Sequence, residues 1–123
     1  MEKILVIEDE PDIQILIQMA LEFTGGYQVT VASTGKAGID SARAAQPDLI
    51  LLDAMMPGMD GFEVCRRLKG DPETAKIPVV FLTAKAQASE IEEGLRLGAA
   101  GYLTKPFDPL RLKIELEALL GIK

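Results

Sequence analysis

Residues 49–53 read Leu-Ile-Leu-Leu-Asp, a short run of large aliphatic side chains that ends in a carboxylate. A run of this length without polar alternation is typical of a strand buried on both faces, as in parallel sheets covered by helices. Residues 3–9, Lys-Ile-Leu-Val-Ile-Glu-Asp, repeat the pattern, because a second aliphatic run ends in acidic side chains. The two stretches favour an α/β fold that carries acidic side chains at the ends of its strands.

The rest of the chain continues this alternation of short apolar runs and longer amphipathic stretches. It predicts five strand-helix units around a parallel sheet that is covered on both faces. We expect the strands at residues 3–7, 28–32, 49–52, 79–82 and 101–104. Residues suited to helix N-termini precede or open the five amphipathic stretches, namely Pro11, Ser33 or Thr34, Asp60, Ser89 and Asp108.

The composition bounds the size of the protein and excludes several classes of function. With 123 residues, the chain is long enough for one domain with its own core and too short for a second. Its net charge of −6 disfavours direct binding to nucleic acid, which needs clustered Lys and Arg. The chain has no histidine, which excludes histidine-dependent triads and most catalytic zinc sites.

The expected compartment follows from the cysteine content and from hydropathy. Cys65 is the single cysteine, so an intrachain disulfide cannot form, and its apolar neighbours predict a small buried side chain. The first residues lack the apolar length of a signal peptide, and no later segment is long enough to span a bilayer. We therefore expect a cytoplasmic protein without membrane insertion.

Charged side chains follow three of the predicted strands: Glu8 and Asp9 after the first, Asp53 after the third, and Lys105 after the fifth. The carboxyl ends of parallel strands share one sheet edge, so these side chains should converge there. Like charges about 4 Å apart repel by about 4 kcal/mol at an effective dielectric of about 20, so the site favours a bound cation. All-oxygen ligation suits Mg²⁺. Taken singly, each residue is equally well explained as a solvated loop charge.

Four motifs in this order resemble the receiver domain of two-component response regulators, over the whole length of the chain. They are Glu8-Asp9, residues 53–61, Thr83-Ala84 and Lys105-Pro106-Phe107. The resemblance implies a flavodoxin-like, doubly wound sheet of five parallel strands in the order 2-1-3-4-5 with five helices. It also implies a stand-alone receiver domain over residues 1–123, which a sensor histidine kinase or a histidine phosphotransfer protein phosphorylates. Such a domain is not an enzyme toward other substrates, because it catalyses only its own phosphorylation and dephosphorylation.

The resemblance assigns the phosphoacceptor and the metal ligands. Asp53 would be the carboxylate nucleophile that becomes an acyl phosphate. Asp9, Asp53 and the backbone carbonyl of Met55 would bind Mg²⁺ directly, and Glu8 would act through a coordinated water. Glu8 departs from the aspartate that the family often has at this position, and its extra methylene suits a water-mediated contact.

The same resemblance assigns the residues that contact the phosphoryl group and respond to it. Lys105 would place its ammonium on one phosphoryl oxygen, and Thr83 would donate its hydroxyl to another. The Lys105-Pro106 peptide is expected to be cis, as X-Pro peptides can be. Thr83 would move toward the phosphoryl oxygens, and Tyr102 would turn inward into the space that Thr83 leaves.

Three other functions share part of this pattern. Phosphatases of the haloacid dehalogenase type have an aspartate nucleophile followed two residues later by an aspartate acid, but that position is Met55 here. An FMN carrier of the same fold class needs a phosphate loop without competing anions, whereas Glu8, Asp9 and Glu10 follow the first strand. A degenerate receiver that only binds partners would not need an intact Asp53 and Lys105.

Two helices carry apolar residues outside their predicted core stripes. The fifth helix has Leu110 and Ile114 beside a stripe of Leu112, Leu116 and Leu119. The first helix has a similar row: Ile15, Met19 and Phe23. By resemblance, the first helix docks the phosphodonor, and the fourth helix, fifth strand and fifth helix form a homodimer or effector interface. The alternative that the Leu110 pair packs against a neighbouring helix stays open at this point.

Overall fold

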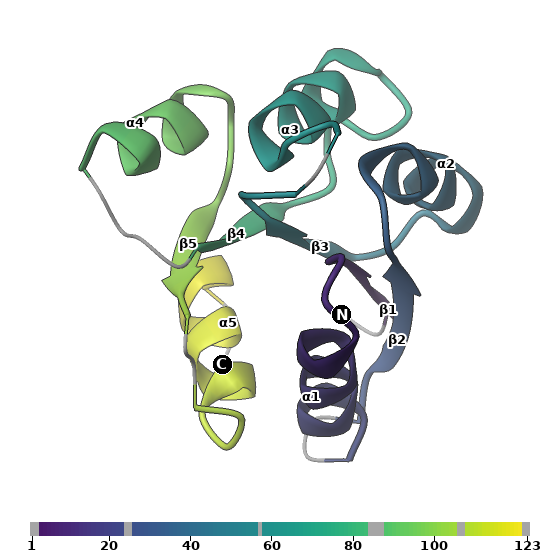
Figure 1. Cartoon of the computed structure of the whole chain (residues 1–123), viewed down its shortest axis with the longest axis vertical. Coiled ribbons are helices and arrows are strands. Elements are labelled where there is room, and N and C mark those ends of the chain that lie inside the picture. The colour runs from purple at the N-terminus through teal and green to yellow at the C-terminus, as the bar shows by residue number, and fades with distance from the viewer. Residues whose placement is uncertain (1–2, 24–25, 57, 84–87, 106–107, 122–123) are drawn as a thin grey trace.

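The chain folds into one parallel sheet with helices on both faces (Figure 1). The structure is a computed structural model that describes residues 3–23, 26–56, 58–83, 88–105 and 108–121. Five strands pair in the order β2-β1-β3-β4-β5, which confirms the predicted fold and strand order. The strands are β1 (Lys3–Ile7), β2 (Gln28–Ala32), β3 (Leu49–Asp53), β4 (Val79–Thr83) and β5 (Gly101–Thr104). The helices are α1 (Pro11–Phe23), α2 (Gly35–Ala45), α3 (Gly61–Gly70), α4 (Ala88–Arg96) and α5 (Leu112–Leu120).

The location of β3 and β4 in the middle of the sheet explains why their sequences are almost entirely apolar. All residues of β3 and β4 are buried, and successive side chains enter two different cores. In β3, Ile50 and Leu52 pack on the side of α2 and α3, whereas Leu49 and Leu51 pack on the side of α1 and α5. Each strand end therefore lies at a fixed edge of a rigid, two-sided sheet.

The helices form two layers. In Figure 1, α2, α3 and α4 lie above the sheet, and α1 and α5 lie side by side below it. The longest helix of the described residues, α1, has 13 residues. Among those residues, no helix has both the length and the apolar character that a membrane span requires.

Polar caps fix the starts of two helices where the sequence predicts them. The Thr34 side chain accepts a hydrogen bond from the Ala37 amide at 3.1 Å and begins α2. The Asp60 carboxylate accepts from the Glu63 amide at 2.9 Å and begins α3. These caps confirm Thr34 and Asp60 as helix N-caps and set the direction of the chain that leaves the functional edge of the sheet.

The other two predicted caps are wrong in position. Helix α4 already begins at Ala88, so Ser89 lies within its first turn. Helix α5 begins at Leu112, because the Asp108 carboxylate accepts from the Leu110 amide at 2.9 Å and forms a separate turn first. Leu119 was predicted as part of the core stripe of this helix, but it is 38% exposed over the edge strand β5, so this prediction is wrong.

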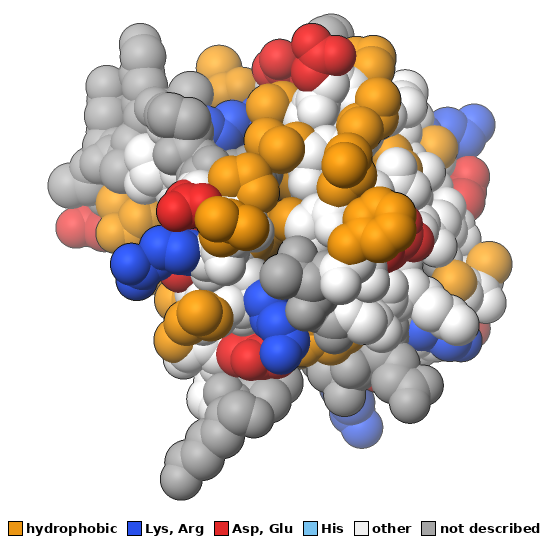
Figure 2. Space-filling model, turned by 90° about the horizontal axis from the view of Figure 1, so that it is seen from below, with side chains coloured by type: hydrophobic (Ala, Val, Ile, Leu, Met, Phe, Trp, Pro, Cys, Tyr) orange, Lys and Arg blue, Asp and Glu red, His pale blue; other side chains and the backbone are white. Residues whose placement is uncertain are grey.

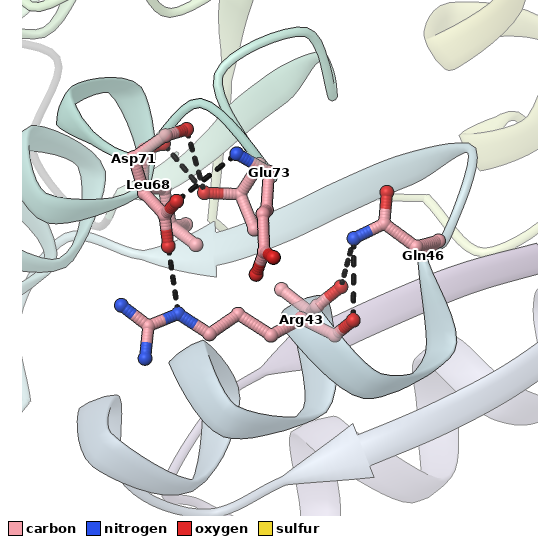
Figure 3. A network of polar contacts seen from close by, with 7 residues as sticks. Arg43, Gln46, Leu68, Asp71 and Glu73 are labelled. Atoms are coloured by element: carbon pink, nitrogen blue, oxygen red, sulfur yellow. Dashed lines mark hydrogen bonds and ion pairs between the residues drawn. The ribbon is translucent and has the colours of Figure 1, made fainter.

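A polar network joins α2 to the loop after α3 (Figure 3). Arg43 Nε donates to Asp71 Oδ2 at 2.7 Å, and the Glu73 amide donates to Asp71 Oδ1 at 3.0 Å. Gln46 ends α2 in the left-handed region with φ of 49°, and its side chain donates to the Arg43 carbonyl at 3.2 Å. Because Arg43 is exposed, the ion pair contributes little to the stability of the fold.

Candidate functional site

Glu8, Asp53 and Lys105 meet at the carboxyl edge of the sheet. Glu8 follows β1, Asp53 ends the neighbouring β3, and Lys105 follows β5. The Lys105 ammonium lies 2.8 Å from Glu8 Oε1 and 3.5 Å from Asp53 Oδ2. The convergence expected from three separate strand ends is therefore present in the structure.

This cluster is almost shielded from water. Glu8 is fully buried, Asp53 is 3% exposed, and the Lys105 side chain is 14% exposed. Burying charged groups is costly unless they are paired, and here one ammonium faces two carboxylates. The cluster thus holds more negative charge than its single cation can balance.

The surroundings shift the pKa values of the two carboxyl groups in opposite directions. Burial raises the pKa of Asp53 to about 7, and the hydrogen bond and charge of Glu8 add to this, although the Met55 amide opposes it. Burial also favours a higher pKa for Glu8, but the Lys105 ammonium, the Glu10 amide and Asp53 together lower it below its ordinary value. Glu8 is therefore the ionised partner, and Asp53 retains a proton to higher pH.

Lys105 is held in its charged form by the same contacts. Burial by itself lowers the pKa of an ammonium, yet the contact with Glu8 and the charge of Asp53 raise the pKa of Lys105 above its ordinary value. The Lys105 amide also donates to the Thr83 carbonyl at 2.7 Å, which ties the start of this loop to the end of β4. Side chain and backbone are thus both anchored at the site.

Three consecutive acidic residues offer oxygen ligands for a cation. The carboxylate oxygens of Glu8, Asp9 and Glu10 include a set that lies within 4.8 Å of one another. Glu8 Oε1 is buried and, within the part of the chain that the structure describes, has no well-directed hydrogen bond despite the nearby ammonium. The excess of carboxyl groups over cations and the all-oxygen donors fit Mg²⁺. Asp53 lies next to Glu8 but outside this set of three.

Thr83 and Tyr102 border a small cavity between α4 and the sheet. Thr83 is buried at the end of β4 and Tyr102 is 38% exposed on β5. The cavity has a volume of about 20 Å³, and Phe81 and Gly94 also line it. Space of this size holds about one water molecule. The structure thus places both predicted switch residues around one cavity, next to the strand end that precedes Lys105.

Parts of the predicted motifs lie outside the described residues. They are Pro57, Ala84, Pro106 and Phe107. The cis peptide expected between Lys105 and Pro106 therefore stays a prediction, because Pro106 lies outside the described residues.

Sequence reasoning gave Gly61 no role, although it shapes the loop that carries Asp53. A Cβ atom at Gly61 would lie 2.3 Å from the Asp53 carbonyl oxygen, and the Gly61 amide donates to the Ala54 carbonyl at 3.1 Å. Any side chain there would push the backbone of Asp53 aside. A glycine at the first position of a helix, where its propensity is poor, was the available signal.

Gln14 was missed altogether. Its side-chain amide donates to the Glu8 carbonyl at 2.5 Å and to Ser33 Oγ at 3.1 Å. A glutamine on an amphipathic helix is common, so the sequence holds no signal for this contact.

The apolar residues outside the predicted core stripes lie on the surface. Leu110 is 77% exposed and Ile114 is 61% exposed, which excludes the alternative that they pack against a neighbouring helix. On α1, Ile15, Met19 and Phe23 are exposed as well. Seen from the side on which α1 and α5 lie in Figure 1, hydrophobic side chains form adjacent rows on the surface (Figure 2).

Comparison with known proteins agrees with this geometry. The family described as "Response regulator receiver domain" matches residues 4–117. The DNA-binding dual master transcriptional regulator RpaA of Synechocystis is 47% identical over 120 residues, which cover 98% of this chain and 49% of RpaA. Response regulator PleD of Caulobacter vibrioides is 42% identical over 98% of this chain and 26% of its own length.

Solved structures give the same family. The chemotaxis protein CheY4 of Vibrio cholerae superposes with a TM-score of 0.91 at 31% identity, covering 97% of this chain and 98% of CheY4. The chain spans about half the length of RpaA and about a quarter of PleD, both of which are longer regulators. The matched residues include the acidic strand ends, Thr83 and Lys105. The chain belongs to the family of response regulator receiver domains.

Proposed function

We propose that this receiver domain accepts a phosphoryl group on Asp53, with Mg²⁺ as cofactor, and changes its partner contacts as a result. The donor would be a sensor histidine kinase or a histidine phosphotransfer protein. The observation that carries the proposal is the largely shielded Lys105 ammonium, 2.8 Å from Glu8 Oε1 and 3.5 Å from Asp53 Oδ2. A fixed cation beside a buried carboxylate prepares the site for an incoming anionic group.

The reaction requires an ionised Asp53. Its carboxylate oxygen forms a bond to phosphorus while the bond between phosphorus and the donor nitrogen breaks. The raised pKa of Asp53 opposes ionisation, and a second cation close to the cluster would favour the ionised carboxylate at neutral pH. Asp9, Asp53 and the Met55 carbonyl would hold Mg²⁺, with Glu8 acting through water. When bound, Mg²⁺ supplies positive charge to the phosphoryl oxygens.

Lys105 and Thr83 would receive the phosphoryl oxygens. The Lys105 ammonium is already placed by Glu8 and Asp53 and loses little freedom on binding the new anion. Thr83 would donate its hydroxyl to a second oxygen from the end of β4. The domain would catalyse only its own phosphorylation and dephosphorylation, without turnover of other substrates.

Two surfaces would serve different partners. The exposed apolar residues of α1 suit docking of the phosphodonor, and α4, β5 and α5 suit a homodimer or effector interface that depends on phosphorylation. The net charge of −6 supports protein partners over direct nucleic-acid binding by this domain. A DNA output, as in the name of RpaA, would require a further domain. Action in the cytoplasm, where histidine kinases present their donor domains, is part of this proposal.

Labelling with a small acyl phosphate tests the proposal. Incubation with acetyl phosphate and Mg²⁺ should add one base-labile phosphate by mass spectrometry, and EDTA should prevent it. Asp53→Asn should remove the labelling, while Asp60→Asn, in the same loop but exposed at the cap of α3, should retain it. Full labelling of Asp53→Asn would refute the site, and no labelling of the unaltered domain would favour the degenerate receiver that only binds partners.

A further inference from the structure

The side chain of Gln14 reaches from α1 to the loop that carries the acidic residues. Gln14 is half-buried in the helix, and its Nε2 atom donates to the backbone carbonyl of Glu8 at 2.5 Å. That carbonyl lies just beyond β1, which ends at Ile7, so the strand ladder does not hold it. Gln14 supplies the hydrogen bond that the sheet does not.

The peptide held by Gln14 connects two of the acidic residues. The Glu8 carbonyl belongs to the peptide group that joins Glu8 to Asp9. Because a peptide group is planar, fixing its carbonyl also fixes the direction in which the chain enters Asp9. The buried Glu8 side chain and the half-exposed Asp9 side chain thus start from Cα atoms on either side of one anchored peptide plane.

Two other hydrogen bonds of this loop involve different atoms of Glu8. The Glu8 amide donates to the Ala32 carbonyl at 3.0 Å, and the Glu10 amide donates to Glu8 Oε2 at 3.1 Å. Neither holds the Glu8 carbonyl. Gln14 Nε2 also donates to Ser33 Oγ, 3.1 Å away, which links the loop after β1 to the loop after β2.

We propose that Gln14 is a positioning residue that sets the Mg²⁺ affinity of the receiver site without touching the metal. The inference rests on the proposed function, since it assumes that Glu8 and Asp9 act on Mg²⁺. Outer residues that orient metal ligands typically change affinity by about 10-fold to 100-fold when removed. Gln14 orients backbone and not a ligand side chain, so we expect about 10-fold, at the lower end of that range.

The chain offers a matched control on the same helix. Gln18 lies one turn after Gln14 and is also half-buried, and among the described residues its side chain makes no polar contact. Gln14→Leu and Gln18→Leu therefore apply the same chemical change, but only the first removes a donor to the acidic loop. Ser33→Ala removes only the hydrogen bond from Gln14 to Ser33 Oγ and should weaken Mg²⁺ binding less than Gln14→Leu does.

Two measurements separate positioning from general stability. Titration calorimetry should give a dissociation constant for Mg²⁺ about 10-fold higher in Gln14→Leu and within about two-fold of the unaltered domain in Gln18→Leu. In EDTA, hydrogen exchange at the Asp9 amide should be faster in Gln14→Leu, while exchange in β3 should be unchanged. If Gln14→Leu does not fold, Gln14→Ala, which leaves room for water, replaces it.

The outcomes bear on the inference and on the proposed function separately. Equal Mg²⁺ affinities in the two Leu variants would overturn the positioning role and leave the proposed function intact. Faster exchange at Asp9 with unchanged affinity would overturn it too, because the contact would then be only structural. If the unaltered domain bound no Mg²⁺, the proposed function would fall, and this inference with it.

Discussion

At the scale of single residues, the site is defined by an imbalance of charge. The Lys105 ammonium contacts Glu8 and Asp53, so one of the two buried carboxyl groups lacks a full counter-charge. The pKa shifts place the proton on Asp53, because Lys105 lies closer to Glu8. Without a metal, therefore, Asp53 is the less stable anion of the pair. This is useful for function, since a cation or a phosphoryl group relieves the cost.

Neutralising Asp53 should stabilise the metal-free domain. The pKa of Asp53 in the folded state is raised from 3.8 to about 7. The stability that the protonated Asp53 carboxyl contributes to the folded domain is therefore fully present below the unfolded pKa and is lost as pH rises through about 7. The shift corresponds to at most about 4 kcal/mol, and local relaxation should reduce it to about 1–3 kcal/mol. In EDTA, the advantage of Asp53→Asn in the free energy of unfolding by urea should grow from about pH 5 to about pH 8.

Asp12→Asn is the control for this experiment, because Asp12 is exposed in the first turn of α1. Its effect on stability should hardly vary over the same pH range. With saturating Mg²⁺, the unaltered domain should become more stable than Asp53→Asn, since the ion stabilises only the unaltered domain. A pH-independent difference between Asp53→Asn and the unaltered domain would contradict the assignment of the proton.

Asp9 and Glu8 should contribute unequally to Mg²⁺ binding. Asp9 is half-exposed and free to bind the ion directly, whereas Glu8 is buried against Lys105 and is expected to act through water. Asp9→Ala should abolish binding, and Glu8→Gln should weaken it by about 10-fold to 100-fold. Because the chain has no tryptophan, titration calorimetry is the direct measurement. Equal losses in the two variants would refute the division of roles.

At the scale of helices and strands, the sequence predicted what a repeating pattern can encode. The five strands were predicted to within one residue, because each is a short apolar run fixed by burial on one or both faces. Thr34 and Asp60 were predicted as caps, since their side chains bond within three residues along the chain. Short-range capping contacts and the periodic pattern of buried residues can both be read from a single sequence.

Features that depend on tertiary contact were not predictable in the same way. Helix α5 starts late because Asp108 bonds to Leu110 in a turn, which competes with capping by the same side chain. The roles of Gln14 and Gly61 arise from contacts with the loops after β1 and β3, and neither has a period or motif of its own. For the site itself, the strand-end acids and Lys105 were predicted, whereas their supporting residues were not.

The Thr83 and Tyr102 switch should require movement of α4. The cavity that both residues line is about 20 Å³, far too small for a phenol ring, and α4 forms one wall through Gly94. An inward Tyr102 must therefore displace Thr83, shift α4, or both. Structures with and without a beryllofluoride mimic of the acyl phosphate should show Thr83 nearer Asp53, Tyr102 turned inward and α4 displaced.

A comparison variant sharpens this test. Tyr102→Ala should still accept phosphate from acetyl phosphate, because Tyr102 lies outside the charged cluster, but α4 should then stay in place with the mimic bound. If Tyr102 keeps its outward position and Thr83 does not move in the mimic-bound domain, the coupling is wrong.

At the scale of the whole molecule, exposed apolar side chains are concentrated on one layer of helices. Both α1 and α5 carry such residues, and the two helices lie side by side below the sheet (Figure 1). Asp53, the proposed phosphoacceptor, lies at the end of β3, so both helices belong to the same layer beside the site. Exposed apolar area of this kind is typical of partner-binding surfaces.

The α5 surface, formed by Leu110 in the turn just before α5 and by Ile114 within it, should act only after phosphorylation. We expect Leu110→Ser with Ile114→Ser to leave acetyl phosphate labelling of Asp53 and urea stability nearly unchanged, because these side chains are 77% and 61% exposed. Association of the beryllofluoride-activated domain, measured by analytical ultracentrifugation, should weaken by about 10-fold or more if the pair lies at the centre of the interface.

Ile15→Ser with Met19→Ser is the matched control, since it removes two exposed aliphatic side chains from the other helix of the same layer. This control should associate normally on activation and should instead accept phosphate more slowly from a cognate histidine donor, while acetyl phosphate labelling stays normal. The two surfaces have separate roles if the α5 variant loses only association and the α1 variant loses only fast phosphotransfer from the histidine donor. Normal association of the α5 variant, or equal loss in both variants, would show that the apolar layer acts as one unspecialised surface and would refute the assignment of α5 to the activated state.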